Sequence, residues 1–172
     1  MADLTQPLFL DATVLSNFAS SDSVDWLTTL LENPVAVPAV RTELKRGLEH
    51  GYGFLDRVID QLGSEITILE VNSNTRGPDE SELRSRLDPG EAESLLGAIT
   101  HDGTLVTDDL AARRVAAEFD VPVTGSIGLL VLGIRRDALA VETANEWLTT
   151  WRDERGYYAP VERIEDVLSN EE

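Results

Sequence analysis

Several acidic side chains either follow short apolar runs of the sequence or open the amphipathic segments behind them. The apolar run 8–10 ends in Asp11, and the run 105–107 is followed by two further aspartates. Carboxylates in such positions can hold a hard divalent cation or exchange protons with a substrate. The candidates are Asp11, Glu43, Glu91, Glu93, Asp108 and Asp109.

Composition restricts this chemistry to oxygen ligands. The 172 residues include no cysteine and two histidines, His50 and His101. Disulfides, thiolate metal sites, a cysteine nucleophile and a histidine-rich metal site are therefore excluded. Clustered carboxylates repel one another, and without sulfur or imidazole partners they favour Mg²⁺ or Mn²⁺.

Most of these acids also have a purely structural interpretation, and the sequence leaves both open. Asp108 or Asp109 can cap the helix that follows them. Glu91 can complete a capping box, and Glu43 can be an ordinary exposed helix residue in a chain with 32 acidic residues. Asp11 is the exception, because a carboxylate at the tip of an apolar strand is partly desolvated.

The elements that must position these acids alternate between short apolar runs and amphipathic stretches. This alternation predicts an α/β fold with a parallel sheet. The predicted strands are 8–10, 35–37, 66–71, 105–107 and 121–123. The predicted helices are 12–19, 24–31, 39–50, 54–62, 92–99, 110–119, 126–134, 144–151 and 161–168, with a polar loop at 72–78. Because parallel strands end at one edge of their sheet, four separate segments should bring their acids to the same rim.

Four segments resemble, in order and spacing, the four acidic motifs of PIN-domain nucleases: 8–17, 37–44, 90–93 and 105–109. Later segments are similar to a branch of that family close to VapC-type toxins: 112–116, 123–128 and 156–158. The resemblance covers nearly the whole chain. It implies a five-stranded parallel sheet flanked by helices and a ribonuclease site that depends on Mg²⁺ or Mn²⁺.

Residue by residue, the resemblance makes Asp11 the first acid of the site and Glu43 the second. The third is Glu93 when counted back from residues 96–98, although the Gly-Glu-x-Glu form also allows Glu91. For the fourth acid, the Thr-x-Asp pattern selects Asp109, with Asp108 beside it. In such a site a metal ion would polarise a phosphodiester oxygen of RNA and lower the pKa of the attacking water.

Further residues match positions that support this chemistry. The polar side chains of Ser16, Asn17 and Thr107 match positions that orient the carboxylates, and Arg113 and Arg114 are candidates for binding phosphate.

Three other classes of protein compete with this interpretation. A haloacid dehalogenase-type phosphatase needs a second aspartate two positions after the first, where this chain has Thr13. A receiver domain needs a lysine late in the sheet, but Lys45 is the only lysine. The remaining alternative is a PIN-like module that binds RNA or protein without cleaving it.

The charge is strongly negative. Aspartate and glutamate number 32 against 14 lysines and arginines, which gives a formal net charge of −18. Such a surface resembles that of proteins from halophilic archaea, in which molar salt screens self-repulsion. We therefore expect a halophilic protein.

The length fits one PIN-like domain over 1–172, with a C-terminal helical region at about 142–172. We expect a cytoplasmic location, because no apolar stretch is long enough for a membrane span and residues 1–7 lack the basic start of a signal peptide. Phe18, Trp26 and Leu27 lie in an apolar stretch that one small sheet would not cover. We therefore expect a homodimer or a complex with an antitoxin protein.

Overall fold

The computed structural model describes residues 4–71 and 78–170. Its sheet has five strands in the order β3-β2-β1-β4-β5, and every pair is parallel. The strands are β1 (Leu8–Leu10), β2 (Pro34–Ala36), β3 (Thr67–Ile68), β4 (Thr104–Val106) and β5 (Val123–Thr124). The predicted parallel α/β fold is confirmed.

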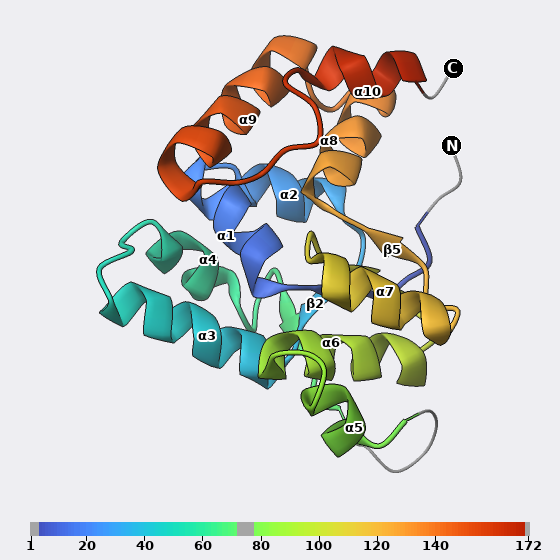
Figure 1. The fold of residues 1–172 in the computed structure, drawn as a ribbon. Coiled ribbons are helices and arrows are strands. Elements are labelled where there is room, and N and C mark those ends of the chain that lie inside the picture. The colour runs from blue at the N-terminus through green and yellow to red at the C-terminus, as the bar shows by residue number, and fades with distance from the viewer. Residues whose placement is uncertain (1–3, 72–77, 171–172) are drawn as a thin grey trace.

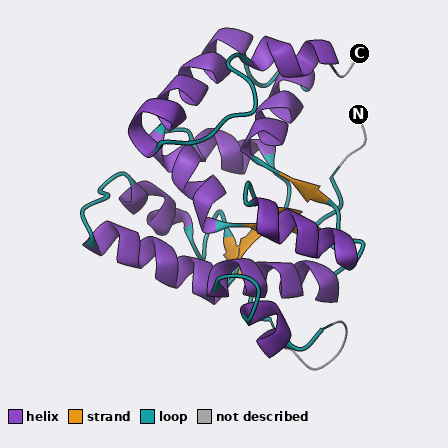
Figure 2. Ribbon diagram, viewed as in Figure 1, coloured by secondary structure: helices purple, strands orange, loops and turns teal. Residues whose placement is uncertain are grey.

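Helices cover both faces of this sheet (Figures 1 and 2). They are α1 (Ala12–Ser20), α2 (Val24–Leu30), α3 (Pro38–Glu49), α4 (Leu55–Gln61), α5 (Glu80–Arg84), α6 (Pro89–Thr100), α7 (Leu110–Glu118), α8 (Ser126–Arg135), α9 (Val141–Arg155) and α10 (Ile164–Asn170).

The strand order reverses between β1 and β4. From β1 the chain moves outward through β2 to β3, then returns to β4 on the other side of β1 and continues to β5. The backbone N–H of Asp11 donates to the carbonyl of Val106 over 2.9 Å, so the pairing runs to the ends of both strands. Ligands of open α/β sheets bind at such a reversal, beyond the carboxyl ends of the strands.

The prediction from the sequence omitted one helix and misplaced two strands. The short helix α5 forms where none was predicted, because Asp79 caps its N-terminus and Leu83 is fully buried. The third strand was predicted over 66–71, but only Thr67 and Ile68 pair with β2 at the edge of the sheet. The fifth strand lies at 123–124 rather than 121–123. Of the predicted polar loop, residues 72–77 lie outside the described residues.

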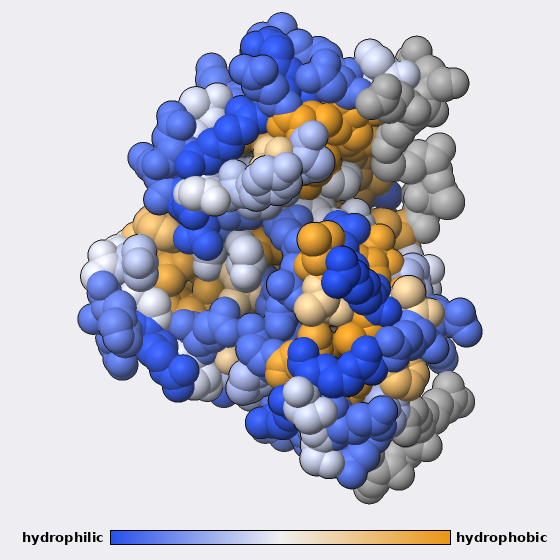
Figure 3. All heavy atoms as spheres, viewed as in Figure 1, coloured by the Kyte–Doolittle hydropathy of each residue, from blue (hydrophilic) through white to orange (hydrophobic). Residues whose placement is uncertain are grey.

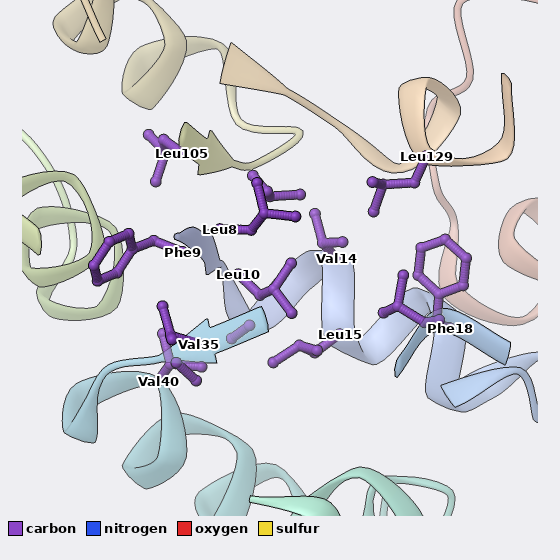
Figure 4. Packing of buried hydrophobic residues seen from close by; sticks show 14 of the residues in the cluster. Leu8, Phe9, Leu10, Val14, Leu15, Phe18, Val35, Val40, Leu105 and Leu129 are labelled. Carbon is purple, nitrogen blue, oxygen red and sulfur yellow. The ribbon is translucent and has the colours of Figure 1, made fainter. Parts of the chain in front are cut away.

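The core is built around β1, whose three residues are fully buried. Phe9 points away from Leu8 and Leu10 (Figure 4) and packs against α6. A Cβ atom at Gly97 of α6 would lie 2.4 Å from the Phe9 ring, so this helix approaches the strand only because residue 97 has no side chain.

The apolar residues of α1 and α2 are covered within the chain. Phe18 of α1 packs against Trp26 of α2 and against Trp147 and Trp151 of α9, with ring centroids 5.0 to 6.3 Å apart. The expectation that this surface needs a second protein to cover it was wrong. The homodimer stays a prediction, without that support.

Candidate functional site

Asp11 occupies the centre of the site, at the end of β1. The residue is 3% exposed, and its carboxylate accepts hydrogen bonds from the Ala12 N–H at 2.8 Å and from the Thr107 hydroxyl at 2.9 Å. Burial raises the pKa of Asp11 to about 7, with further contributions from the charges of Asp88 and Glu43, and the two hydrogen bonds oppose the shift. The predicted desolvation of this aspartate is confirmed.

Glu43 and Asp88 approach the same point from α3 and from the start of α6. A Cβ atom at Gly90 would lie 3.5 Å from Glu43 Oε1 and 3.7 Å from Asp88 Oδ1. Desolvation, followed by the negative charge of Asp88, raises the pKa of Glu43. Close packing of α6 against α3 at this glycine therefore brings two carboxylates together.

Glu91 belongs to the same group of charges. It accepts a hydrogen bond from the backbone N–H of Asp88 at 3.2 Å, and its own N–H donates to Asp88 Oδ1 at 2.8 Å, which forms the predicted capping box. Desolvation and then Asp88 raise the pKa of Glu91 to about 8, with smaller contributions from Asp11 and Asp109. The interpretation of Glu91 as part of a capping box is confirmed, and its role in the site stays a prediction.

Glu93 is engaged elsewhere. Its Oε1 accepts the backbone N–H of Ala39 at 3.3 Å, and its Oε2 lies 3.6 Å from Arg84 of α5. The charge of Asp11, by contrast, contributes to the raised pKa of Glu91. Of the two glutamates that the sequence left open for the third acid, Glu91 is the one that shares the environment of Asp11.

The two aspartates after β4 differ in their contacts. Asp109 caps α7 through the Ala112 N–H at 2.9 Å and contributes to the raised pKa of Glu91. Asp108 accepts hydrogen bonds from the backbone and hydroxyl of Ser126, at 2.8 and 2.6 Å, and holds the start of α8. Both line the same groove.

The predicted supporting residues connect these carboxylates to the rest of the fold. Thr107 donates to Asp11 and accepts the N–H of Asp109 at 3.2 Å. Asn17 donates to Asp108 at 3.3 Å and to Ser126 at 3.1 Å, while Ser16, which is buried, lines a second hollow beside the groove.

A groove of about 780 Å³ lies over the carboxyl ends of β1 and β4. Asp88, Glu91, Asp108 and Asp109 line it together with cations and aromatic rings from α7, from the end of α9 and from the segment that follows α9. These other lining residues include Arg113, Arg155, Tyr157 and Tyr158.

The predicted phosphate-binding arginines separate in the structure. Arg113 lines the groove, and its Nε donates to the Thr107 carbonyl at 3.2 Å. Arg114 is exposed on α7 and is not among the residues that line the groove.

Three residues of this site are not among the candidates that the sequence offered. They are Asp88, Arg155 and Tyr158. The one local signal for the latter two was the break at 156–158, where Gly156 ends α9 with a φ of 62° and sends the chain across the groove.

A family model described as a PIN domain matches residues 8–172. The chain belongs to the PIN-domain family. No curated protein and no solved structure matches it. PIN domains are typically nucleases and generally use divalent metal ions, so the family accords with a groove lined by carboxylates and points to nucleic acid as the substrate.

The carboxylate oxygens of this PIN domain are donors that suit a hard cation, but those in the described residues are not closely clustered. Within 4–71 and 78–170, no three acidic or histidine side chains converge tightly enough to form a metal-binding group. Mg²⁺ keeps several water ligands and is commonly held by one or two carboxylates, so a looser arrangement of acids fits it. Burial, together with the charges of Asp88 and Glu43, disfavours the ionised form of Asp11 and raises its pKa.

None of the helices in the described part of the chain has the length and apolar character that a membrane crossing requires.

Proposed function

We propose that this protein is a ribonuclease that hydrolyses RNA phosphodiester bonds with the help of Mg²⁺ or Mn²⁺. The observation that carries the proposal is the buried Asp11 at the strand-order reversal, whose pKa is raised to about 7 and whose charge is coupled to those of Glu43 and Asp88. Keeping an unneutralised carboxylate in such a position destabilises the fold, and binding a cation would offset that cost.

Asp11, Glu43, Glu91 and Asp109 would surround the metal ion, one or two of them by direct contact and the others through its water ligands, with Glu91 as the third acid of the site in preference to Glu93. The support for Glu91 is its coupling to both Asp11 and Asp109. Bound there, the ion would supply charge for the phosphate oxygens and lower the pKa of a water. Asp88 would add to the negative potential that attracts the ion.

The remaining residues of the groove would position the substrate. Thr107 holds Asp11 Oδ2 in a fixed direction, and Asn17 orients both Asp108 and Arg155. Arg113 and Arg155 are the cations on the groove wall that can meet phosphate oxygens. The likeness to VapC-type toxins, and with it a role as the toxin of a toxin–antitoxin pair, rests on the sequence motifs alone.

Cleavage of defined RNAs tests the proposal. The purified protein should cut RNA in the presence of Mg²⁺ or Mn²⁺, and cleavage should stop when EDTA removes the ion. The Asp11→Asn variant should not cut RNA. Asp60→Asn is the matched control, since Asp60 is an exposed residue of α4 that lines neither hollow. If the protein binds RNA but leaves it intact under every metal and salt condition, the nuclease proposal is wrong and the protein is a non-catalytic binding module.

A further inference from the structure

A second hollow of about 360 Å³ lies directly beside the groove. Arg155 lines both hollows and therefore stands at their boundary. Glu43, whose charge acts on Asp11, also lines the second hollow. The hollow therefore adjoins the candidate active site.

Apolar and aromatic side chains form about half of the lining of this hollow. Leu44, Phe54 and Leu55 contribute to it, and Tyr52 stands at its wall with 55% of its surface exposed. The Tyr52 and Phe54 rings meet edge to face, with centroids 6.0 Å apart. Figure 3 shows apolar side chains open to solvent in this region, between the end of α9 and α3. An exposed ring backed by a second ring is a platform on which a flat group can stack.

Arg155 supplies a positive charge at the boundary. Its Nε donates to Asn17 Oδ1 at 2.8 Å, and its guanidinium carbon lies 5.7 Å from the centre of the Phe54 ring. The group is partly buried, and no acidic side chain in the described part of the chain pairs with it. A fixed guanidinium that lacks a carboxylate partner suits a phosphate.

We propose that the second hollow is a nucleotide subsite, in which the base of a nucleotide next to the cleaved phosphodiester stacks on Tyr52 while Arg155 binds the phosphate between subsite and active site. The proposal rests on the ribonuclease function proposed above. Glu43 and Glu154 also line the hollow and would repel a phosphate inside it. A neutral base therefore belongs in the hollow and the phosphate at Arg155.

Photocrosslinking locates the base. The full-length Asp11→Asn protein is mixed with single-stranded RNAs that carry one 5-iodouridine at successive positions, irradiated and digested with trypsin. Cleavage after Arg46 and Arg57 releases residues 47–57, which contain Tyr52 and Phe54, whereas the groove residues Tyr157 and Tyr158 fall in the peptide 156–163. We expect one position of the RNA to label 47–57. Label only in 156–163, or in neither peptide, overturns the subsite.

Binding measurements test the role of the ring. We expect Tyr52→Ala to weaken binding of single-stranded RNA by between about fivefold and about a hundredfold, as loss of one base–aromatic stack does, while Tyr52→Phe keeps the affinity. An abasic nucleotide at the crosslinked position should abolish the difference between Tyr52 and Tyr52→Ala. Equal affinity of Tyr52→Ala and the unchanged protein for intact RNA contradicts the proposal.

These readouts are independent of cleavage. If the unchanged protein cuts RNA but neither labels 47–57 nor responds to Tyr52→Ala, the subsite fails and the ribonuclease stands. If 47–57 is labelled and no metal supports cleavage, the ribonuclease fails while the base-binding hollow stands. If circular dichroism shows that Tyr52→Ala does not fold, the crosslinking experiment, in which Tyr52 is unchanged, still tests the subsite.

Discussion

At the scale of single residues, the electrostatics of this PIN domain centre on Asp11. The residue is 3% exposed, and the charges of Asp88 and Glu43 add to the effect of burial. Hydrogen bonds from Thr107 and Ala12 favour the ionised form, yet the pKa of Asp11 still rises to about 7. The ionised, metal-free site therefore lowers the free energy of unfolding, and a proton or a cation restores it.

The Asp11→Asn variant should consequently be more stable than the unchanged protein when no metal is present. We expect the free energy of unfolding at about pH 8 to rise by roughly 1–3 kcal/mol, because each pKa unit corresponds to about 1.4 kcal/mol and the amide keeps an acceptor for the Ala12 N–H. Urea unfolding followed by circular dichroism measures the change. Asp60→Asn should shift stability by less than about 0.5 kcal/mol. A less stable Asp11→Asn protein would contradict this account.

The same carboxylates predict how stability depends on pH. The folded-state pKa values of Asp11, about 7, and Glu91, about 8, lie above their ordinary values of 3.8 and 4.5. Between these limits the folded state binds more protons than the unfolded state, so stability falls as pH rises. Thermal melts in EDTA should show a lower midpoint at about pH 8.5 than at about pH 5.5.

Two controls isolate that pH dependence. Asp11→Asn should flatten the part of the curve that Asp11 causes, and saturating Mn²⁺ should flatten it further because the ion replaces the protons. A midpoint that rises with pH in the unchanged, metal-free protein would refute the assigned pKa directions.

At the scale of elements, the site depends on how closely α6 approaches the sheet. Gly97 of α6 faces the ring of Phe9, and at the other end of the helix Gly90 faces Val40 and Glu43 of α3. These contacts fix where the first turn of α6, which carries Glu91, lies relative to Asp11. A change in the packing of this helix should therefore disturb the carboxylates as well as the core.

Gly97→Ala tests this packing. Alanine is the better helix former by about 0.5–1 kcal/mol, but its Cβ would lie 2.4 Å from a ring carbon of fully buried Phe9. Overpacking of this kind costs about 1–3 kcal/mol, so we expect a net loss of stability in urea unfolding together with reduced cleavage of RNA. At Gly53 a Cβ meets nothing within 4 Å, and Gly53→Ala should leave stability nearly unchanged. Equal stabilities of the two variants would argue against the close approach.

At the scale of the whole molecule, the net charge of −18 acts against both folding and substrate binding. Figure 3 shows hydrophilic side chains over most of the face that it presents. Nucleic acid is also anionic, so charges far from the groove repel it in dilute buffer. Salt shortens the reach of this repulsion, from about 10 Å at 0.1 M to about 3 Å at 1 M, but affects contacts of a few ångströms much less.

We therefore expect thermal stability and RNA cleavage to rise together with KCl into the molar range. This is the reverse of the usual behaviour of nucleic-acid-binding proteins, whose affinity falls as salt rises. Circular dichroism melts measure the effect on the fold, and cleavage at a temperature where the protein is folded at every salt concentration measures the effect on the substrate. A midpoint that is equal at about 0.1 M and about 2 M KCl, with fastest cleavage in the dilute buffer, would contradict the halophilic prediction.

Features that depend on neighbouring residues could be predicted from the sequence. Apolar runs that end in an acid predicted that Asp11 and Asp109 follow the strands β1 and β4, and both do. The capping box that Glu91 could complete is present at the start of α6. Alternation of strands and helices predicted the parallel sheet. Each of these features follows from local backbone preferences and from hydrophobic periodicity.

Tertiary structure decided which acids act together. Glu91 and Glu93 lie two positions apart on one helix, so their side chains lie about 160° apart around its axis and only one can face Asp11. With α6 packed against β1 and α3, the pKa of Glu91 responds to the charge of Asp11, whereas Glu93 contacts Ala39 and Arg84. Arg155 reaches Asn17 across 138 positions of sequence because α9 packs on α1. No local pattern encodes such pairings, since they depend on the strand order and on the rotation of each helix about its own axis.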